Sequence, residues 1–282
     1  INPWDLAYVS EKYKKENYGV SQEELKQYFP VENVIKGLFK LVKSLYGIEV
    51  KIKKTKSVWH PDVRLYEIFD KNKNLRGKFY FDLYARPNKR GGAWMDECIQ
   101  RRLKSNGSVQ APVAFITCNS SPATKASPAF FTHYDVETLF HEFGHGLQHM
   151  LTKVDYAGIS GISGVEWDAV ELPSQFMENW CWEKDVLDTF AFHFETNQKL
   201  PNKLFKKLLA TKNYNSGMAL LRQIEFSLFD FLLHMNEEKK KTKLTETVLQ
   251  SVRKETSLLA VHKNNKFQNS FAHIFSGGYA AG

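Results

Sequence analysis

Residues 141–145 read His-Glu-Phe-Gly-His inside a segment whose apolar residues recur at three- and four-residue spacing. Thr132, with Asp135 three positions later, gives this segment a variant of the capping box that begins a helix. The pattern predicts an amphipathic helix of about 18 residues. Its apolar positions are Val136, Leu139, Phe140, Phe143, Leu147 and Met150. Any fold of this chain must therefore bury one face of that helix.

Two histidines and a glutamate in this helix predict a metal centre. His141 and His145 lie one turn apart and project from the same face, so both imidazoles can reach one ion. Glu142 lies beside them, close enough to touch a metal-bound water but poorly aimed to bind the metal. Two nitrogens for zinc and one carboxylate for a proton are what metal-assisted hydrolysis needs. The alternative, two hydrogen-bonded core histidines, leaves Glu142 without a reason to be half buried.

A third ligand must come from elsewhere, because a catalytic zinc ion takes three protein ligands and leaves one position for water. The downstream candidates are Glu166, Asp168, Glu171 and Glu178. We select Glu171, because it begins a second predicted helix, residues 171 to about 183, that can pack across the first. Glu178 and Asp168 both remain candidates for a hydrogen bond to a ligand imidazole.

The same residues predict a reaction. Zinc lowers the pKa of a bound water to about 7, and Glu142 takes its proton while the hydroxide attacks a peptide carbonyl. Glu142 then delivers that proton to the departing amine. The oxyanion that forms needs a further donor. His273 and Tyr279 are of the required types and bracket a glycine-rich stretch, although the residues alone slightly favour a core histidine and a packed tyrosine.

Composition excludes several classes of protein. The 282 residues, 43% of them hydrophobic, suffice for a substantial core, and no apolar run approaches the roughly 18 residues of a membrane span. Cys98, Cys118 and Cys181 form no CxxC pair, so we expect free buried thiols in a reducing cytoplasm. The net charge is +8, but the lysine clusters at 51–56 and 239–243 accompany no nucleic-acid-binding module. We expect neither a nucleic-acid nor a membrane partner.

The predicted elements are mainly helical with a small sheet. Residues 1–50 are helical in pattern, residues 51–120 are β-rich, and residues 121–282 form a helical region around the predicted zinc site. One helix starts at Pro30 and ends at Gly47, and Val63–Asp70 with Leu75–Tyr84 predict a hairpin. Further predicted elements are a strand over Val113–Cys118 and helices over 202–209, 218–235 and 244–261. Gly158, Gly161 and Gly164 mark either a tight connector or a backbone that approaches a ligand.

Several motifs resemble the thimet oligopeptidase family of zinc metallopeptidases, and the similarity runs over essentially the whole chain. The resemblance implies a zincin-type catalytic domain within a mainly helical, two-lobed body, whose deep channel admits short peptides. It implies one zinc ion held by His141, His145 and Glu171, with Glu142 as base, and it implies substrate or transition-state contacts from His273 and Tyr279. The motifs are the segments 79–86, 89–95, 141–149, 170–182 and 273–279.

The chain departs from the family pattern in two respects. Gln148 stands where the family usually has a further histidine; that histidine is not a ligand, so we expect tuning of the site and not loss of metal. Family chains are also longer at both ends than Ile1 to Gly282. The resemblance implies that a missing N-terminal half forms the opposite channel wall and that a tyrosine-rich segment follows. We therefore expect residues 1–282 to be one catalytic-domain fragment that binds zinc but is weakly active or inactive alone.

The leading hypothesis is a monomeric cytoplasmic zinc endopeptidase that hydrolyses short peptides. A dipeptidyl carboxypeptidase of the same family is the first alternative. A module that retains zinc and binds peptides without catalysis is the second. The third, anion binding through the basic surface, predicts retention on heparin that salt weakens steeply.

Overall fold

The computed structural model describes residues 2–235 and 244–277. The protein is mainly helical with a small sheet, as the sequence predicted, and its chain divides into two compact units. Residues 20–209 form the first, here called the sheet unit; residues 1–19 and 210–282 form the second, here called the terminal unit. That residues 1–282 are one catalytic-domain fragment stays a prediction. Each unit is described by itself.

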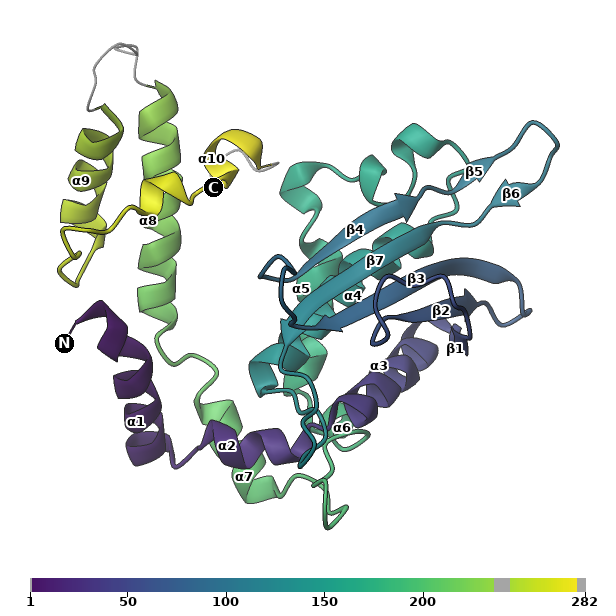
Figure 1. Ribbon diagram of the computed structural model, residues 1–282, viewed down its shortest axis with the longest axis horizontal. Helices are drawn as coiled ribbons and strands as arrows, with labels where there is room; N and C mark the ends of the chain where they lie inside the picture. Colours follow the sequence, from purple (N-terminus) through teal and green to yellow (C-terminus); the bar gives the residue numbers. More distant parts are fainter. Residues whose placement is uncertain (1, 236–243, 278–282) are drawn as a thin grey trace. The chain divides into compact units, whose positions relative to one another are not determined.

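The main sheet of the sheet unit has five strands: β1 (Glu49–Lys53), β2 (Arg64–Phe69), β3 (Leu75–Tyr84), β4 (Trp94–Ile99) and β7 (Val113–Ser120). Their order is β1-β2-β3-β7-β4 (Figure 1). The predicted hairpin is confirmed, because β2 and β3 pair antiparallel. The predicted third strand is β7, which runs parallel to β3 and antiparallel to the edge strand β4. Neither β1 nor β4 was predicted. Two short strands, β5 (Arg102–Leu103) and β6 (Val109–Gln110), form a separate pair.

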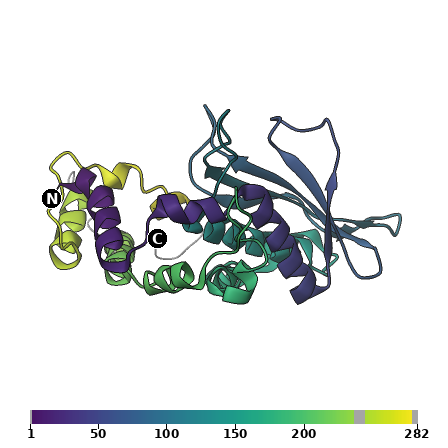
Figure 2. The ribbon, with the colours of Figure 1, turned by 90° about the horizontal axis from the view of Figure 1, so that it is seen from below.

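Helices α3 (Val31–Tyr46) and α4 (His133–Met150) cover one face of this sheet (Figure 2). Phe39 of α3 and Phe143 of α4 both pack on Phe79 of β3, with ring centroids 6.2 and 5.3 Å from its own. Phe79 and Phe143 are fully buried, and each such ring contributes roughly 150–250 Å² of buried surface to the core. The apolar face of α4 is thereby fixed on the sheet, and its opposite face is left for the histidines.

The predicted start of helix α4, which carries His141 and His145, is confirmed. The hydroxyl oxygen of Thr132 accepts the backbone N–H of Asp135 at 3.1 Å, and the Asp135 carboxylate accepts the N–H of Thr132 at 2.8 Å. These bonds satisfy N–H groups that a helix start leaves unpaired. Helix α3 differs in one detail: Pro30 is its N-cap instead of its first residue, while Gly47, at φ 66°, ends it as predicted.

The helix predicted from residue 171 is α5 (Leu172–Asn179), and Pro173 lies in its first turn. A 3-10 turn, Trp180–Trp182, continues it. The glycine-rich segment forms two further 3-10 turns, Ala157–Ile159 and Gly161–Gly164. The remaining helices of this unit are α2 (Gln22–Leu25), α6 (Lys184–Leu187) and α7 (Asn202–Ala210). The last residue of α7, Ala210, is the first residue of the second segment of the terminal unit.

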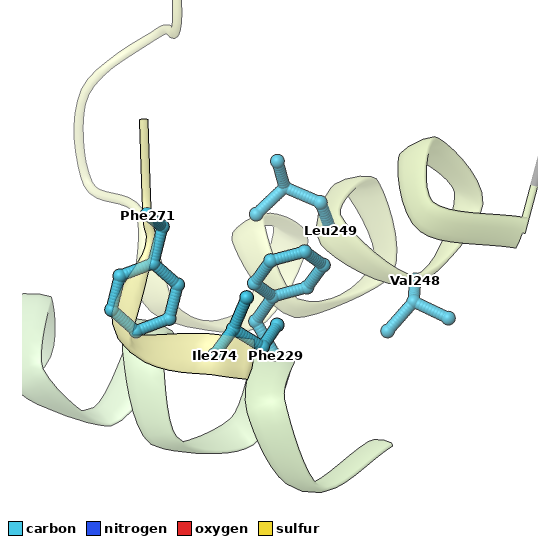
Figure 3. Close-up of a cluster of buried hydrophobic side chains, with 5 residues drawn as sticks. All are labelled: Phe229, Val248, Leu249, Phe271 and Ile274. Atoms are coloured by element: carbon cyan, nitrogen blue, oxygen red, sulfur yellow. The ribbon is translucent and has the colours of Figure 1, made fainter. Parts of the chain in front are cut away.

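The terminal unit is helical in its described part: α1 (Leu6–Tyr18), α8 (Ser216–Met235), α9 (Leu244–Thr256) and α10 (His273–Ser276). Its core, drawn in Figure 3, consists of Phe229, Val248, Leu249, Phe271 and Ile274. The predicted helix over 244–261 ends early, at Thr256. The hydroxyls of Thr256 and Ser257 donate to backbone carbonyls and so compete with the helical pattern there. Among the described helices, none combines the length and apolar content that crossing a bilayer requires.

The three cysteines are free. Cys118 and Cys181 are buried, as predicted, but the prediction is wrong for Cys98, which is exposed. Cys98 lies on the edge strand β4, where the register with β7 shifts between Glu97 and Ile99, and an irregular edge leaves a side chain open to water.

Asp82 ties the loop after β3 to the sheet. Its carboxylate accepts hydrogen bonds from Arg86 at 2.6 and 2.8 Å, from Lys89 at 2.9 Å and from the indole N–H of Trp59 at 2.8 Å. Lys89 also donates to three backbone carbonyls at the ends of β3 and β7. Burial raises the pKa of Asp82, but the hydrogen bonds from Arg86, Lys89 and Trp59 outweigh it and hold that pKa well below its usual range.

We therefore expect Asp82→Asn to lower the free energy of unfolding by on the order of 3 kcal/mol at neutral pH, because two cations lose their buried partner. The folded-state pKa is depressed, so this stabilisation is present above the unfolded pKa of about 3.9 and is lost as pH falls through the folded-state value. Urea unfolding at pH 7 and at progressively lower pH measures both effects. Asp96→Asn, at an exposed acid on β4, is the control; equal losses in both variants would contradict the assignment.

Candidate metal centre

Helix α4 presents His141 and His145 side by side, with ring centroids 4.9 Å apart. Both side chains are partly buried, at 25% and 12% exposure. Glu142, one position along the helix, is 7% exposed. The helical spacing in the sequence thus produces the predicted arrangement: two imidazoles on one face with a buried carboxylate beside them.

Glu171 completes the cluster from the start of α5. Its Oε2 lies 3.2 Å from Nε2 of His141 and 3.2 Å from Nε2 of His145. One ligand atom from each of the three residues lies within 4.8 Å of the others, and no second cluster of this kind occurs in the described ranges 2–235 and 244–277. The structure therefore brings together the three residues that the sequence singled out as metal ligands.

Glu171 can reach the histidines because α4 and α5 approach closely at Gly144. A Cβ atom added to Gly144 would lie 2.5 Å from the backbone oxygen of Pro173 and 2.6 Å from Cα of Ser174. Both are backbone atoms of α5, so they cannot swing aside as the end of a side chain can. A residue other than glycine at position 144 would push α5, and Glu171 with it, away from the two histidines.

Ser174 orients the Glu171 carboxylate. Its side chain is fully buried, and its hydroxyl lies 2.7 Å from Oε2 of Glu171 and 2.8 Å from the backbone oxygen of the same residue. A hydroxyl so placed fixes the rotamer of a carboxylate that approaches from the first turn of a helix. Sequence analysis missed both Ser174 and Gly144. A glycine inside an otherwise strong helical pattern was the available signal for Gly144, because it costs about 1 kcal/mol relative to alanine.

The structure distinguishes between the two acids considered for a bond to a ligand imidazole. Oε1 of Glu178, on α5, lies 2.5 Å from Nδ1 of His141. Asp168 is exposed in a 3-10 turn, Trp167–Ala169. With Nδ1 donating to Glu178, the neutral form of the His141 imidazole has its lone pair on Nε2, the nitrogen that faces Glu171. Nδ1 of His145 is buried without a hydrogen-bond partner in the part of the chain that is described.

The protonation of the cluster follows from its charges. Burial lowers the pKa of His141, but the carboxylates of Glu171 and Glu178 raise it to about 9. At neutral pH a metal ion must therefore displace a proton from this imidazole. Burial raises the pKa of Glu142, and this outweighs the lowering by the charges of His141 and His145.

The donor set fits a zinc ion. Tetrahedral zinc holds imidazole nitrogen and carboxylate oxygen at about 2.0–2.2 Å, which places two ligand atoms about 3.3 Å apart. The two measured nitrogen–oxygen separations of 3.2 Å match that spacing. Two imidazoles and one carboxylate also leave the fourth position free for water.

A cavity of about 420 Å³ opens beside the cluster. It is lined by Ala93, Tyr134, Glu137, Thr138, His141, Glu142 and Glu178. Because Glu142 lines this cavity, a ligand that enters it would lie against that carboxylate. A cavity of about 520 Å³ in the terminal unit is larger but contains none of the metal-centre residues.

Two predicted site residues remain, His273 and Tyr279. His273 lies in α10 of the terminal unit and is exposed, so its alternative interpretation as a core histidine is wrong. Tyr279 lies outside the described residues. Gln148, where the family usually has a histidine, is exposed on α4. The roles of His273 and Tyr279 stay predictions from the resemblance.

Known proteins are similar to this chain over essentially its whole length. It is 53% identical to oligopeptidase A of Escherichia coli strain K12, 44% to a probable cytosolic oligopeptidase A of Arabidopsis thaliana and 34% to dipeptidyl carboxypeptidase of Escherichia coli strain K12. These alignments cover 99–100% of the chain but 41–42% of the relatives, so the chain spans about two fifths of their length. The sequence model of peptidase family M3 also matches residues 1–282. The chain belongs to peptidase family M3, which confirms the resemblance that its motifs indicated.

Proposed function

We propose that the protein to which this chain belongs is a zinc-dependent endopeptidase that hydrolyses short peptides, and that this chain carries its catalytic centre. The observation that carries the proposal is the convergence of His141, His145 and Glu171 next to the buried carboxylate of Glu142. The names of the relatives, oligopeptidase A and dipeptidyl carboxypeptidase, support peptide substrates.

Each residue has a role in this proposal. A zinc ion held by His141, His145 and Glu171 supplies Lewis-acid activation of a water molecule and of the peptide carbonyl. Glu142 accepts the proton of that water on its carboxylate and delivers it to the amine of the leaving peptide. Its burial raises its pKa towards the working pH, which favours both transfers. Glu178 holds the Nδ1 proton of His141 and so keeps Nε2 available as a ligand.

The finer features implied by the family resemblance belong to the same proposal. They are a zincin-type catalytic domain, a two-lobed body with a channel, and contacts from His273 and Tyr279 to the substrate or transition state. We also expect the 282-residue chain to bind zinc but to be weakly active or inactive alone. Cytoplasmic location and a monomeric state remain predictions, since the relatives include both cytosolic and organellar proteins.

Glu142→Gln in the full-length protein tests the mechanism directly. Removing a general base lowers the rate by about 10²–10⁴-fold, and we expect kcat for a short peptide to fall by that factor while the zinc content stays unchanged. Glu166→Gln, at an exposed acid outside the cluster, is the matched control. An unchanged rate in Glu142→Gln would favour the alternative of a module that binds zinc and peptide without catalysis.

A peptide with a blocked C-terminus separates the two enzymatic alternatives. An endopeptidase accepts it, because internal cleavage needs no free carboxylate, whereas a dipeptidyl carboxypeptidase recognises the free end. We expect mass spectrometry of the products to show internal cleavage at a rate similar to that of the unblocked peptide. Cleavage of the unblocked peptide alone, two residues from its end, would favour the carboxypeptidase.

Gly144→Ala tests the geometry. The added methyl group meets the backbone of Pro173 and Ser174 at about 2.5 Å, so α5 must retreat and Glu171 with it. We expect zinc affinity to fall by roughly 10–100-fold, the range seen when a ligand loses its support, in a chelator competition assay. Gly146→Ala is the matched control, because its Cβ would meet only the side-chain ends of Ile116 and Met150, the nearest at 3.0 Å. Equal affinities in the two variants would contradict the close-approach argument.

A further inference from the structure

One side of helix α4 lines the cavity beside the candidate metal centre. Tyr134, Glu137, Thr138, His141 and Glu142 all line it, and they recur at the three- and four-residue spacing that places side chains on one side of a helix. Glu137 lies one turn before His141, which is about 6 Å along the helix axis. That distance is about two residues of an extended peptide, so a peptide at the metal centre would have a side chain within reach of Glu137.

The Glu137 carboxylate is held in place by the turn that continues α5. The indole N–H of Trp182, in the 3-10 turn Trp180–Trp182, donates to Oε1 of Glu137 at 2.6 Å. Nε2 of the buried His133 donates to the backbone carbonyl of Cys181, in the same turn, at 2.9 Å. The rings of His133 and Trp182 pack edge to face, with centroids 4.3 Å apart. These contacts fix the indole that positions the carboxylate.

Glu137 can accept further hydrogen bonds. An ionised carboxylate has about four lone-pair sites, and this one accepts a single hydrogen bond from the described residues. Nδ1 of His133 lies 3.5 Å from Oε2 of Glu137, which is beyond the usual length of a hydrogen bond. The Glu137 side chain is 24% exposed and lines the cavity. A donor that enters the cavity therefore finds free lone pairs on this carboxylate.

The charged side chains that line the cavity favour a cation. Glu137, Glu142 and Glu178 are among them, whereas the described residues contribute neither lysine nor arginine. Glu178 is bonded to His141. The two positive charges of a bound zinc ion would be offset by the neighbouring carboxylates of Glu142 and Glu171. Glu137 is then the carboxylate that remains available to a ligand, and a cavity lined by one sign of charge attracts the opposite sign.

A purely structural role does not account for the charge of Glu137. The N–H of Trp182 needs one acceptor, and the neutral amide of a glutamine would supply it without adding a third carboxylate to the cavity. An acid stabilises the start of a helix mainly within the first turn, and Glu137 lies in the second turn of α4. Like charges in one site disfavour each other, so a bound cation would relieve the repulsion.

We propose that Glu137 determines substrate specificity by binding the cationic side chain of a lysine or arginine near the scissile bond. The ammonium or guanidinium group donates to the free lone pairs of Glu137, while Trp182 holds the carboxylate. Tyr134, which is 75% exposed, adds an aromatic ring to the lining, and an aromatic ring also favours a cation. The inference rests on the proposed function, since it names the class of peptide that the same site prefers.

Pairs of acetylated peptides, cleaved by the full-length protein, test this proposal. The two peptides of a pair carry lysine or the uncharged norleucine at one position, within two residues of the scissile bond. A hydrogen bond to a charged group contributes about tenfold or more, so we expect kcat/KM for the lysine peptide to exceed that for the norleucine peptide about tenfold at one such position. In Glu137→Gln, which keeps an acceptor for Trp182, this ratio should fall to about one. Asp168→Asn, at an exposed acid outside the cavity, is the control and should keep the wild-type ratio.

Reversing the charge gives a second, independent outcome. We expect Glu137→Lys to cleave a peptide with glutamate at that position faster than its glutamine counterpart, because the cavity then contains a cation. A residue that only supports the fold would change kcat/KM equally for both peptides of a pair. A Glu137→Gln variant that keeps the wild-type ratio overturns the proposal, as does a wild-type enzyme without a preference for lysine at any of these positions.

Binding to the Glu142→Gln protein separates this inference from the proposed function. With cleavage slowed, calorimetry should give a dissociation constant about tenfold lower for the lysine peptide than for its norleucine counterpart, and adding Glu137→Gln should remove the difference. Equal dissociation constants in the Glu142→Gln protein overturn the role of Glu137 even where the wild-type enzyme is active. If Glu142→Gln cleaves at the wild-type rate, the proposed mechanism fails, whereas the ratio of lysine to norleucine cleavage still tests Glu137.

Discussion

The candidate metal centre depends on the contact between two helix backbones at Gly144. Glu171 is the residue just before α5, so the position of that helix decides whether its carboxylate lies 3.2 Å or farther from the two imidazoles. The aromatic core beneath α4 fixes one partner of this contact on the sheet. Ser174, on α5, orients the carboxylate of Glu171 through its hydroxyl. Because Gly144 has no side chain, the backbones of α4 and α5 can touch, and Glu171 at the start of α5 reaches the two histidines of α4.

Much of this site could be predicted from the sequence because it is local or nearly so. The spacing of His141 and His145 is fixed by helical geometry, and the Thr132–Asp135 cap marks where that helix begins. The alternation of Phe79 and Phe81 with polar residues identified β3, and the short loop before it identified the hairpin. The choice of Glu171 over three other acids followed from its place at the start of a helix, where a carboxylate can point across to a neighbour.

The rest depends on contacts between distant segments, for which a single sequence carries no periodic signal. β4 has exposed Asp96 and Cys98 among apolar residues, so it shows neither strict alternation nor a buried run. The choice between Glu178 and Asp168 is decided by the packing of α5 on α4. The buried His149 has its hydrogen-bond partner, the carbonyl of Ile99, on a strand fifty positions earlier. Helix α9 ends earlier than its apolar pattern predicted, because hydroxyl groups near its C-terminus donate to backbone carbonyls.

The network around Asp82 also changes how the positive charge of the chain is understood. Lys89 belongs to a basic loop, residues 86–92, yet its side chain is only 5% exposed. Its ammonium group donates to one carboxylate and to three backbone carbonyls where β3 and β7 end. The carboxylate of Asp82 also neutralises part of the Arg86 charge. The cations in the sequence of this loop therefore overstate the positive potential that it presents to solvent. Arg86 and Lys89 therefore stabilise the fold from within, and they contribute little to the attraction of a polyanion in solution.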